Sequence, residues 1–160
     1  MSKGTKILSS LVLLTLSACA YRPPANVASD PSLSLGLPPA FDTDPAFRLA
    51  LRAPPGSQAL RQARIEYLLE QILRSPYNFI RNGGRYNGKR AKAHFLWKYS
   101  LNRGRVITAE DFIDWVATRS KMSGQSYSVE FPDGKRQPLS PILFRELTVF
   151  DQELRRRRDA

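Results

Sequence analysis

The sequence predicts a small α+β domain, mainly helical, with about four helices and one or two short β-hairpins. Apolar residues recur at helical spacing in several segments that follow residue 57. Two tight-turn sequences, Asn82-Gly83 and Pro132-Asp133-Gly134, stand between short apolar runs. Because the chain has 160 residues and 42% of them are hydrophobic, it can bury one core and hardly two.

The first twenty residues resemble the signal of a bacterial lipoprotein. Lys3 and Lys6 precede an apolar run over residues 7–16, which is shorter than the roughly 20 residues that a membrane span needs. The run ends in Leu16-Ser17-Ala18-Cys19, which is similar to a lipobox. We therefore expect cleavage before Cys19 and acylation of its sulfur. The alternative is an ordinary signal peptide in which the cysteine is incidental.

The composition divides the chain into four expected parts: a signal peptide (1–18), a lipid-anchored proline-rich tether (19–57), a globular domain (58–154) and a basic tail (155–160). Eight of the twelve prolines lie within residues 21–58, and proline keeps a chain extended. Residues 41–51 have a short amphipathic pattern, which leaves a docked turn as an alternative there.

The domain is expected to begin with a helix after Ser57, which Pro76 ends. One face of this helix carries an apolar stripe: Ile65, Leu68, Leu69, Ile72 and Leu73. Residues 79–86 follow as a hairpin, because Asn-Gly supplies the positive φ angles that a two-residue turn requires. Asn87 is expected to cap a second helix over residues 88–101.

The second half of the domain repeats these signals. Thr108 with Asp111 has the spacing of a capping box, so a third helix starts there. Residues 127–131 alternate between apolar and polar side chains before the Pro132-Asp133-Gly134 turn, which predicts a second hairpin. Ser140 before Pro141 is the expected cap of a last helix, whose apolar residues face the core: Leu143, Leu147, Phe150 and Leu154.

Four blocks of the domain resemble a bacterial envelope family of unknown function, typified by YfeK. The blocks are residues 79–83 with Tyr86, the set Ala91, His94, Phe95 and Lys98, residues 107–113, and Ser123-Gly124 with Tyr127. The resemblance implies an exported small α+β domain and no particular reaction. It also implies that relatives place cysteines near positions 77 and 131, where this chain has Tyr77 and Phe131. We therefore expect an aromatic contact between these two residues.

The chain offers few residues for a metal or catalytic centre. A single cysteine and a single histidine exclude a zinc site of the usual Cys/His kind, and we expect neither a metal nor a cofactor. His94 and Lys98 lie on one helical stripe, and we expect both to be structural, with Lys98 paired to Glu110 of the next helix. The alternative makes His94 a general base and Lys98 a cation that steers an anionic substrate.

The positive charge is concentrated in one segment. The formal net charge is +11, and removal of Lys3 and Lys6 leaves 23 basic against 14 acidic residues, a net of +9. Nine basic residues and no acidic residue lie between Glu70 and Glu110. They are expected to form one electropositive surface, with the following binding residues at its centre: Arg81, Arg85, Lys89, Arg90 and Lys92. The alternative is a solvated basic face without a ligand.

These observations predict a lipid-anchored protein of the outer membrane of a Gram-negative bacterium, facing the periplasm. Export makes nucleic acid an unexpected partner. Lipid A, peptidoglycan or an acidic envelope protein would instead bind the basic surface of a non-enzymatic domain. Two alternatives remain: an enzyme that acts on peptidoglycan through Glu110 or Asp114 with His94, and an immunity-type inhibitor of a toxin.

Overall fold

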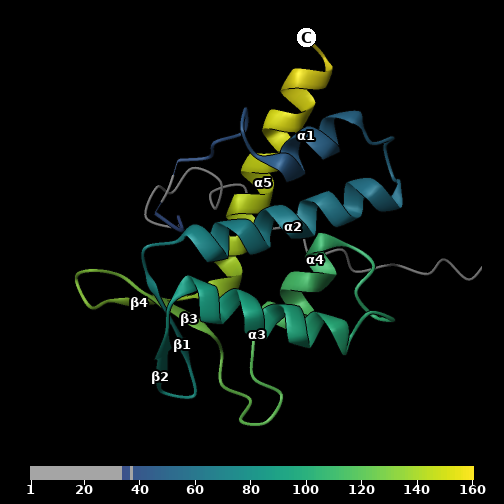
Figure 1. Cartoon of the computed structure of the whole chain (residues 1–160). Coiled ribbons are helices and arrows are strands. Elements are labelled where there is room, and N and C mark those ends of the chain that lie inside the picture. Colours follow the sequence, from purple (N-terminus) through teal and green to yellow (C-terminus); the bar gives the residue numbers. More distant parts are fainter. Residues whose placement is uncertain (1–33, 37) are drawn as a thin grey trace, which may run out of the picture.

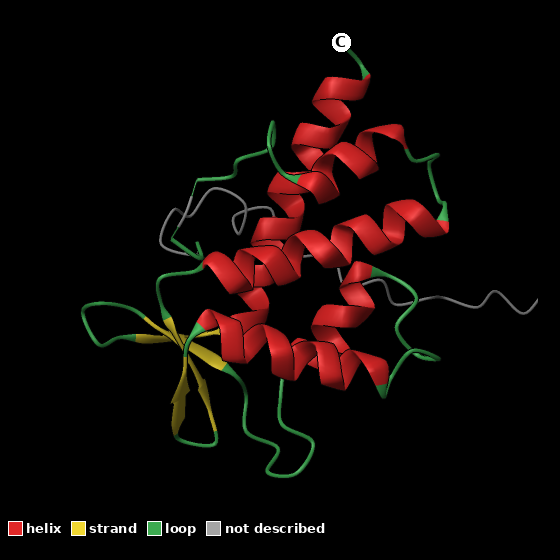
Figure 2. Ribbon diagram, in the orientation of Figure 1, coloured by secondary structure: helices red, strands yellow, loops and turns green. Residues whose placement is uncertain are grey.

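The computed structural model describes residues 34–36 and 38–160, so Cys19 and the expected signal lie outside the described residues. The helices form one body with the sheet at one end (Figures 1 and 2), and the expected mainly helical α+β fold is confirmed. The elements in chain order are α1 (Pro45–Arg52), α2 (Gln58–Arg74), β1 (Asn78–Arg81), β2 (Gly84–Tyr86), α3 (Gly88–Ser100), α4 (Ala109–Phe112), the π-helix η1 (Ile113–Ala117), β3 (Ser128–Glu130), β4 (Arg136–Pro138) and α5 (Leu139–Arg158). None of the helices in the described part is long and apolar enough to cross a membrane.

Helix α2 lies at the centre of the fold and packs against α1, α3, α4 and α5. Four of the five residues predicted for its apolar stripe are buried: Ile65, Leu68, Leu69 and Ile72. The Ser57 hydroxyl accepts a hydrogen bond from the amide of Leu60, so the predicted helix start is confirmed.

Part of the segment expected to be a tether packs into the core: Leu35 is buried, and helix α1 lies within this segment. Helix α1 buries Phe47 completely, and the Phe47 ring lies 4.6 Å from the ring of Phe41 and 5.2 Å from that of Phe150. Asp44 caps this helix and Pro45 occupies its first turn, a position where proline needs no amide partner. The prolines therefore flank the helix instead of interrupting it.

Both predicted hairpins are present, and they join into one antiparallel sheet with the strand order β2-β1-β3-β4. Asn82 and Gly83 form the first turn with φ angles of 49° and 79°, and the turn places Arg81 opposite Gly84. The pairing of β1 with β3 links the two hairpins. Just beyond these strands, the rings of Tyr77 and Phe131 lie 4.9 Å apart, which confirms the expected aromatic contact.

Helix α3 begins in very close contact with the end of α2. A Cβ atom at Gly88 would lie 2.2 Å from the carbonyl oxygen of Ile72 and 2.6 Å from that of Leu73, so only glycine fits there. The Asn87 side chain accepts from the amide of Arg90, as predicted. The close approach of Gly88 to the end of α2 fixes the direction in which α3 leaves the sheet.

The later helices differ from the prediction at their ends. The capping box of Thr108 and Asp111 is confirmed, but α4 continues as a π-helix turn over Ile113–Ala117. The prediction that Ser140 caps the last helix is wrong, because α5 follows β4 directly and begins at Leu139. The expected basic tail is also largely helical, and Arg158 donates to the carbonyl oxygens of Ala50 and Ala53 at the end of α1.

Candidate functional site

A hollow of about 360 Å³ opens between the β1–β2 hairpin and α3, and we call it the Arg81 pocket. Its apolar lining comes mainly from Phe79, Ile80, Ala91 and Phe95, while Arg81, Arg90 and His94 contribute the charged or titratable groups. Tyr86 and Tyr127 complete the wall with two rings. None of these lining residues is an aspartate or a glutamate, so the pocket offers cations and apolar surface together.

The hairpin turn and the α3 stripe bring Arg81 and His94 together. Arg81 Nη1 lies 2.7 Å from His94 Nδ1, and the guanidinium carbon lies 5.1 Å from the centre of the Tyr86 ring. Because a guanidinium group only donates, Nδ1 must accept, and the imidazole proton sits on Nε2. His94 Nε2 then donates to the hydroxyl of Tyr127 at 3.2 Å.

Lys98 lies behind this chain of side chains, and only 4% of its surface is exposed. Its ammonium group donates to the carbonyl oxygens of Val116 and Arg119 and to the hydroxyl of Tyr127. These carbonyls stand at the end of η1, where a helix terminus favours a cation. Lys98 therefore ties α3 to the end of η1, which is a structural role.

The surroundings keep both titratable groups less protonated than usual. Burial, together with the charges of Arg81 and Lys98, lowers the pKa of His94 to about 4. Burial, together with Lys121 and Arg81, lowers the pKa of Lys98 to about 8. His94 is therefore neutral at neutral pH, and as predicted it is half-buried and hydrogen-bonded.

The five predicted binding residues divide into two groups. Arg85 pairs with Glu130 at 2.7 Å, and Lys92 pairs with Glu70 at 3.0 Å, so acidic side chains neutralise both. Lys89 and Arg90 are exposed, and Arg81 is half-buried; within the described residues none of these three has a carboxylate partner. The charge of the expected surface is thus unevenly neutralised, and two of the three cations without a carboxylate partner, Arg81 and Arg90, line the Arg81 pocket.

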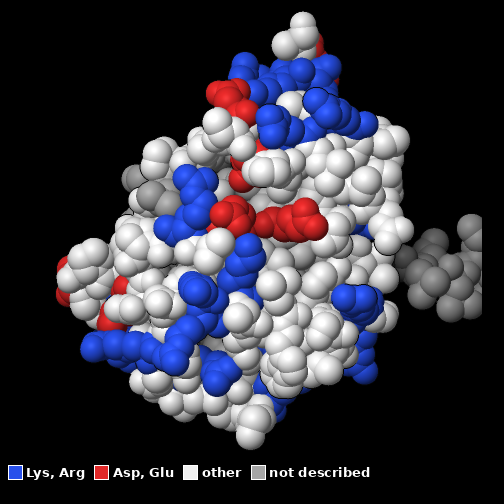
Figure 3. All heavy atoms as spheres, in the orientation of Figure 1, with Lys and Arg blue, Asp and Glu red and all other residues white. Residues whose placement is uncertain are grey.

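Figure 3 shows the same distribution on one face of the molecule. Basic side chains gather at the lower left, over the sheet and the start of α3, and acidic side chains lie above them over α2. Glu130 also pairs with Arg136 of β4 at 2.9 Å. Hydrogen bonds from Arg85 and Arg136 lower the pKa of Glu130, so this carboxylate stays charged between two strands.

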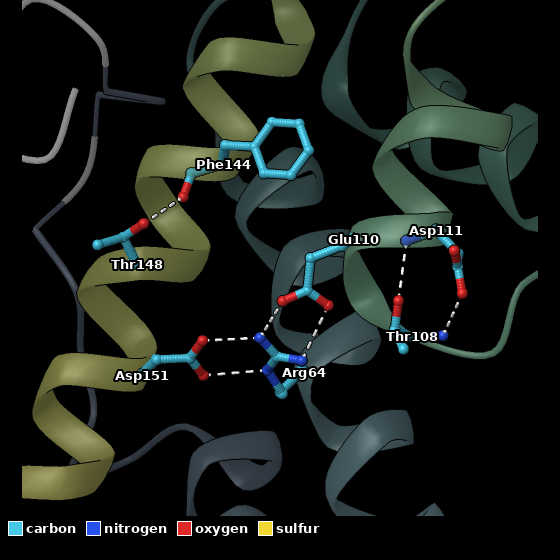
Figure 4. Close-up of polar contacts among 7 residues, drawn as sticks. All are labelled: Arg64, Thr108, Glu110, Asp111, Phe144, Thr148 and Asp151. Atoms are coloured by element: carbon cyan, nitrogen blue, oxygen red, sulfur yellow. Dashed lines mark hydrogen bonds and ion pairs between the residues drawn. The ribbon is translucent and has the colours of Figure 1, made fainter. Parts of the chain in front are cut away.

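The predicted pair of Lys98 with Glu110 is wrong. Glu110 instead binds Arg64 of α2, and Arg64 also binds Asp151 of α5 through two hydrogen bonds of 3.0 and 2.7 Å (Figure 4). Although burial acts to raise the pKa of Glu110, the hydrogen bonds and charge of Arg64 lower it. Arg64 thus joins three helices, and Glu110 lies outside the Arg81 pocket.

Tyr127 has a role in the site that its sequence pattern, which predicted only a strand position, did not indicate. The alternation of residues 127–131 placed Tyr127 correctly on an inward position, but its partners lie 29 and 33 residues away along the chain. Within the described residues, His, Cys, Asp and Glu side chains do not gather in a group of three that could hold a metal ion.

The comparisons with known proteins identify a family and assign no activity. Residues 59–151 match a family of unknown function (DUF5329). An uncharacterized protein, YfeK from Salmonella typhimurium, is 36% identical over 83 residues, which cover 51% of this chain and 69% of that protein. No solved structure matches the chain. Because the family match covers more than half of the sequence, the chain belongs to the DUF5329 family.

Proposed function

We propose that this protein is a lipoprotein of the Gram-negative outer membrane whose periplasmic domain binds an anionic group of the cell envelope in the Arg81 pocket. One observation carries the binding proposal: Arg81 and Arg90 line a single apolar hollow, and within the described residues neither has a carboxylate partner. A guanidinium group in such a place can bind a phosphate or carboxylate through two hydrogen bonds.

The pocket chemistry indicates the kind of ligand. The rings of Tyr86 and Tyr127 and the apolar floor suit a sugar ring or an aliphatic portion next to the anionic group. Because His94 is neutral, it neither repels an anionic ligand nor adds a further positive charge to the pocket. Phosphate on lipid A, carboxylate on peptidoglycan and an acidic side chain of a partner protein all present this shared chemistry.

A matched pair of double variants tests the pocket. Arg81→Gln with Arg90→Gln removes two charges from the pocket, whereas Arg85→Gln with Lys92→Gln removes two that are already ion-paired. We expect the first to weaken binding of lipid A or soluble peptidoglycan fragments at least about tenfold, because each lost charged hydrogen bond costs about 1.5–3 kcal/mol. The second should weaken it less than about threefold. Isothermal titration calorimetry with each ligand separates the two sources.

Equal losses in both double variants would contradict the pocket and indicate nonspecific attraction to the net charge. The control is well matched because Glu130 keeps Arg136 after loss of Arg85, and Glu70 is partly exposed after loss of Lys92. Circular dichroism of each variant shows whether the domain remains folded.

The lipid anchor is tested at Cys19. Cys19→Ser should abolish incorporation of labelled fatty acid and release the domain from the outer-membrane fraction, because stable anchoring requires the acyl chains. Mass spectrometry of the mature N-terminus checks the cleavage position. A mature protein that begins elsewhere and carries no lipid would contradict the proposal.

The enzyme alternative required His94 and a carboxylate in one cleft. Glu110 is bound to Arg64, and Asp114 lines a different hollow with Trp115 and Arg119, so the described residues do not form that arrangement. The geometry therefore supports ligand binding better than hydrolysis of peptidoglycan.

A further inference from the structure

Exposed apolar side chains gather around the loop of residues 118–124, the segment that projects below α3 in Figure 1. Trp97, Leu101 and Met122 border one groove at this loop, with exposed fractions of 58%, 65% and 98%. Trp115, which is 47% exposed, lines a second groove at the same loop. Because Ser120 and Lys121 line both grooves, these side chains form one surface, which we call the tryptophan face.

The tryptophan face is also basic. Lys121 and Arg119 are exposed on the loop, and Arg105 lies 5.3 Å from the centre of the Trp115 ring. Within the described residues these three cations have no carboxylate partner; Lys121 donates to the side-chain oxygen of Asn102. Asp114 is the one acidic residue that lines either groove, and burial raises its pKa.

We propose that the tryptophan face lies on an anionic phospholipid bilayer. Tryptophan, leucine and methionine next to lysine and arginine suit the boundary between acyl chains and headgroups, where apolar bodies insert and cations meet lipid phosphates. The inference goes beyond the proposed ligand binding and rests on the proposed lipid anchor at Cys19. The first groove adjoins the Arg81 pocket, because Arg81, His94 and Tyr127 line both.

The short segment between Cys19 and the described part of the chain favours the bilayer as the partner of this face. Residues 19–33 are the fifteen positions between the proposed acylated Cys19 and the first described residue, and a chain of that length spans at most about 50 Å. A lipid anchor at Cys19 would therefore keep the domain within that distance of the membrane. Such confinement raises the effective concentration of membrane at the tryptophan face, so even weak contacts of this face with lipid can form.

Intrinsic fluorescence provides a direct readout, because both tryptophans of the chain lie on this face. The test uses the mature chain, residues 19–160 with Cys19→Ser, so that the apolar run of residues 7–16 is absent. The vesicles contain either phosphatidylglycerol with phosphatidylethanolamine or phosphatidylcholine alone. We expect a blue shift of the emission and co-sedimentation with the anionic vesicles, both weakening as salt rises. Phosphatidylcholine vesicles should produce neither.

Two variants separate the apolar and charged contributions. Leu101→Ser with Met122→Ser should weaken partitioning about tenfold, because apolar burial is lost. Arg119→Gln with Lys121→Gln should remove most of the salt dependence. Leu49→Ser, at an exposed position on α1, is the control and should leave partitioning unchanged. Met122→Ser alone, at a fully exposed position, keeps the test valid if the double variant folds poorly.

Four results would overturn the proposal: no emission shift with anionic vesicles, an equal shift with phosphatidylcholine, co-sedimentation without any shift, or equal losses in the Leu49→Ser control. A shift that follows protein concentration without lipid would assign the face to self-association. A shift with polyglutamate but not with vesicles would assign it to an acidic protein. Ligand binding in the Arg81 pocket is measured without vesicles, so failure of either proposal is distinguishable from failure of the other.

Discussion

His94 shows how neighbouring residues set the chemistry of a single side chain. A histidine near neutral pH is ordinarily poised between two charge states. Here Arg81 occupies Nδ1, Tyr127 accepts from Nε2, and Lys98 lies behind Tyr127. A proton added to Nδ1 would face the Arg81 guanidinium and break that hydrogen bond. His94 therefore serves as a neutral hydrogen-bonding link between the β1–β2 hairpin and Tyr127, the residue before β3.

The single histidine makes its titration easy to measure. We expect an NMR midpoint near pH 4, well below the ordinary value of 6.5, because burial and then Arg81 and Lys98 disfavour the charged ring. The unfolded chain binds this proton more readily, so the His94 contribution to stability is complete above about pH 6.5 and declines as the pH falls toward 4.

Arg81→Met is the corresponding variant. It removes the nearest positive charge and should raise the titration midpoint of His94 toward its ordinary value. A midpoint that stays near 6.5 in the unmodified protein would contradict the described contacts. An anionic ligand in the Arg81 pocket should also raise the midpoint, since it would offset the charge of Arg81.

At the scale of elements, the contact between α2 and α3 decides where the pocket forms. Gly88 lets the first turn of α3 rest on the last carbonyls of α2, and α3 then carries Arg90, Ala91 and His94 along the hairpin. A larger side chain at position 88 would push the start of α3 away from α2, and the pocket wall that α3 carries would move with it.

Gly88→Ala should destabilise the domain by about 1–3 kcal/mol, because its methyl group would meet two backbone carbonyls that cannot rotate away. Gly104→Ala is the matched control: a Cβ there meets nothing within 4 Å, so its effect should stay within about 0.5 kcal/mol. Urea denaturation of both variants measures the difference. Equal midpoints would show that α3 can withdraw from α2 without cost.

The elements also differ in how far the sequence alone predicts them. Helices with an apolar stripe and a local cap, such as α2 after Ser57 or α4 after Thr108, follow from residues within one or two turns. The pairing of β1 with β3 joins strands of two different hairpins. The Arg64 bridge joins residues that are 46 and 87 positions apart along the chain. Such contacts leave no local periodicity, so they could not be predicted.

The sequence predicted the location of the candidate site but not which of its charged side chains are paired. The charge run located Arg81 and Arg90, but it gave equal weight to Arg85 and Lys92, whose acidic partners come from β3 and α2. Only the fold shows which cations stay unpaired. Lys98 illustrates the limit: its partners are mostly backbone oxygens, and backbone acceptors carry no sequence signal.

At the scale of the whole molecule, the folded unit is larger than the segment that matches the family. That match covers residues 59–151, whereas α1 and the last turns of α5 lie outside it and pack together. Phe47 is fully buried against the rings of Phe41 and Phe150, so α1 belongs to the core.

Phe47→Ala should therefore destabilise the domain by about 3–5 kcal/mol, the usual cost of a large buried cavity. A tether that merely leads to the domain would tolerate the change. Leu49→Ala, on the same helix but 43% exposed, should cost less than about 1 kcal/mol. Thermal unfolding of the two variants distinguishes them, and a similar melting temperature for both would show that α1 is dispensable.

Leu35 is the first buried residue in the described part of the chain. Its side chain is buried, and its amide donates to the Glu146 carboxylate of α5 at 3.2 Å, 111 residues further along. Gly36 follows with a φ of 87° directly against the ring of Tyr77. A mechanical pull applied at Ser34 would consequently be transmitted into α5 through Leu35, and α1 would be shielded from the load until that junction gave way.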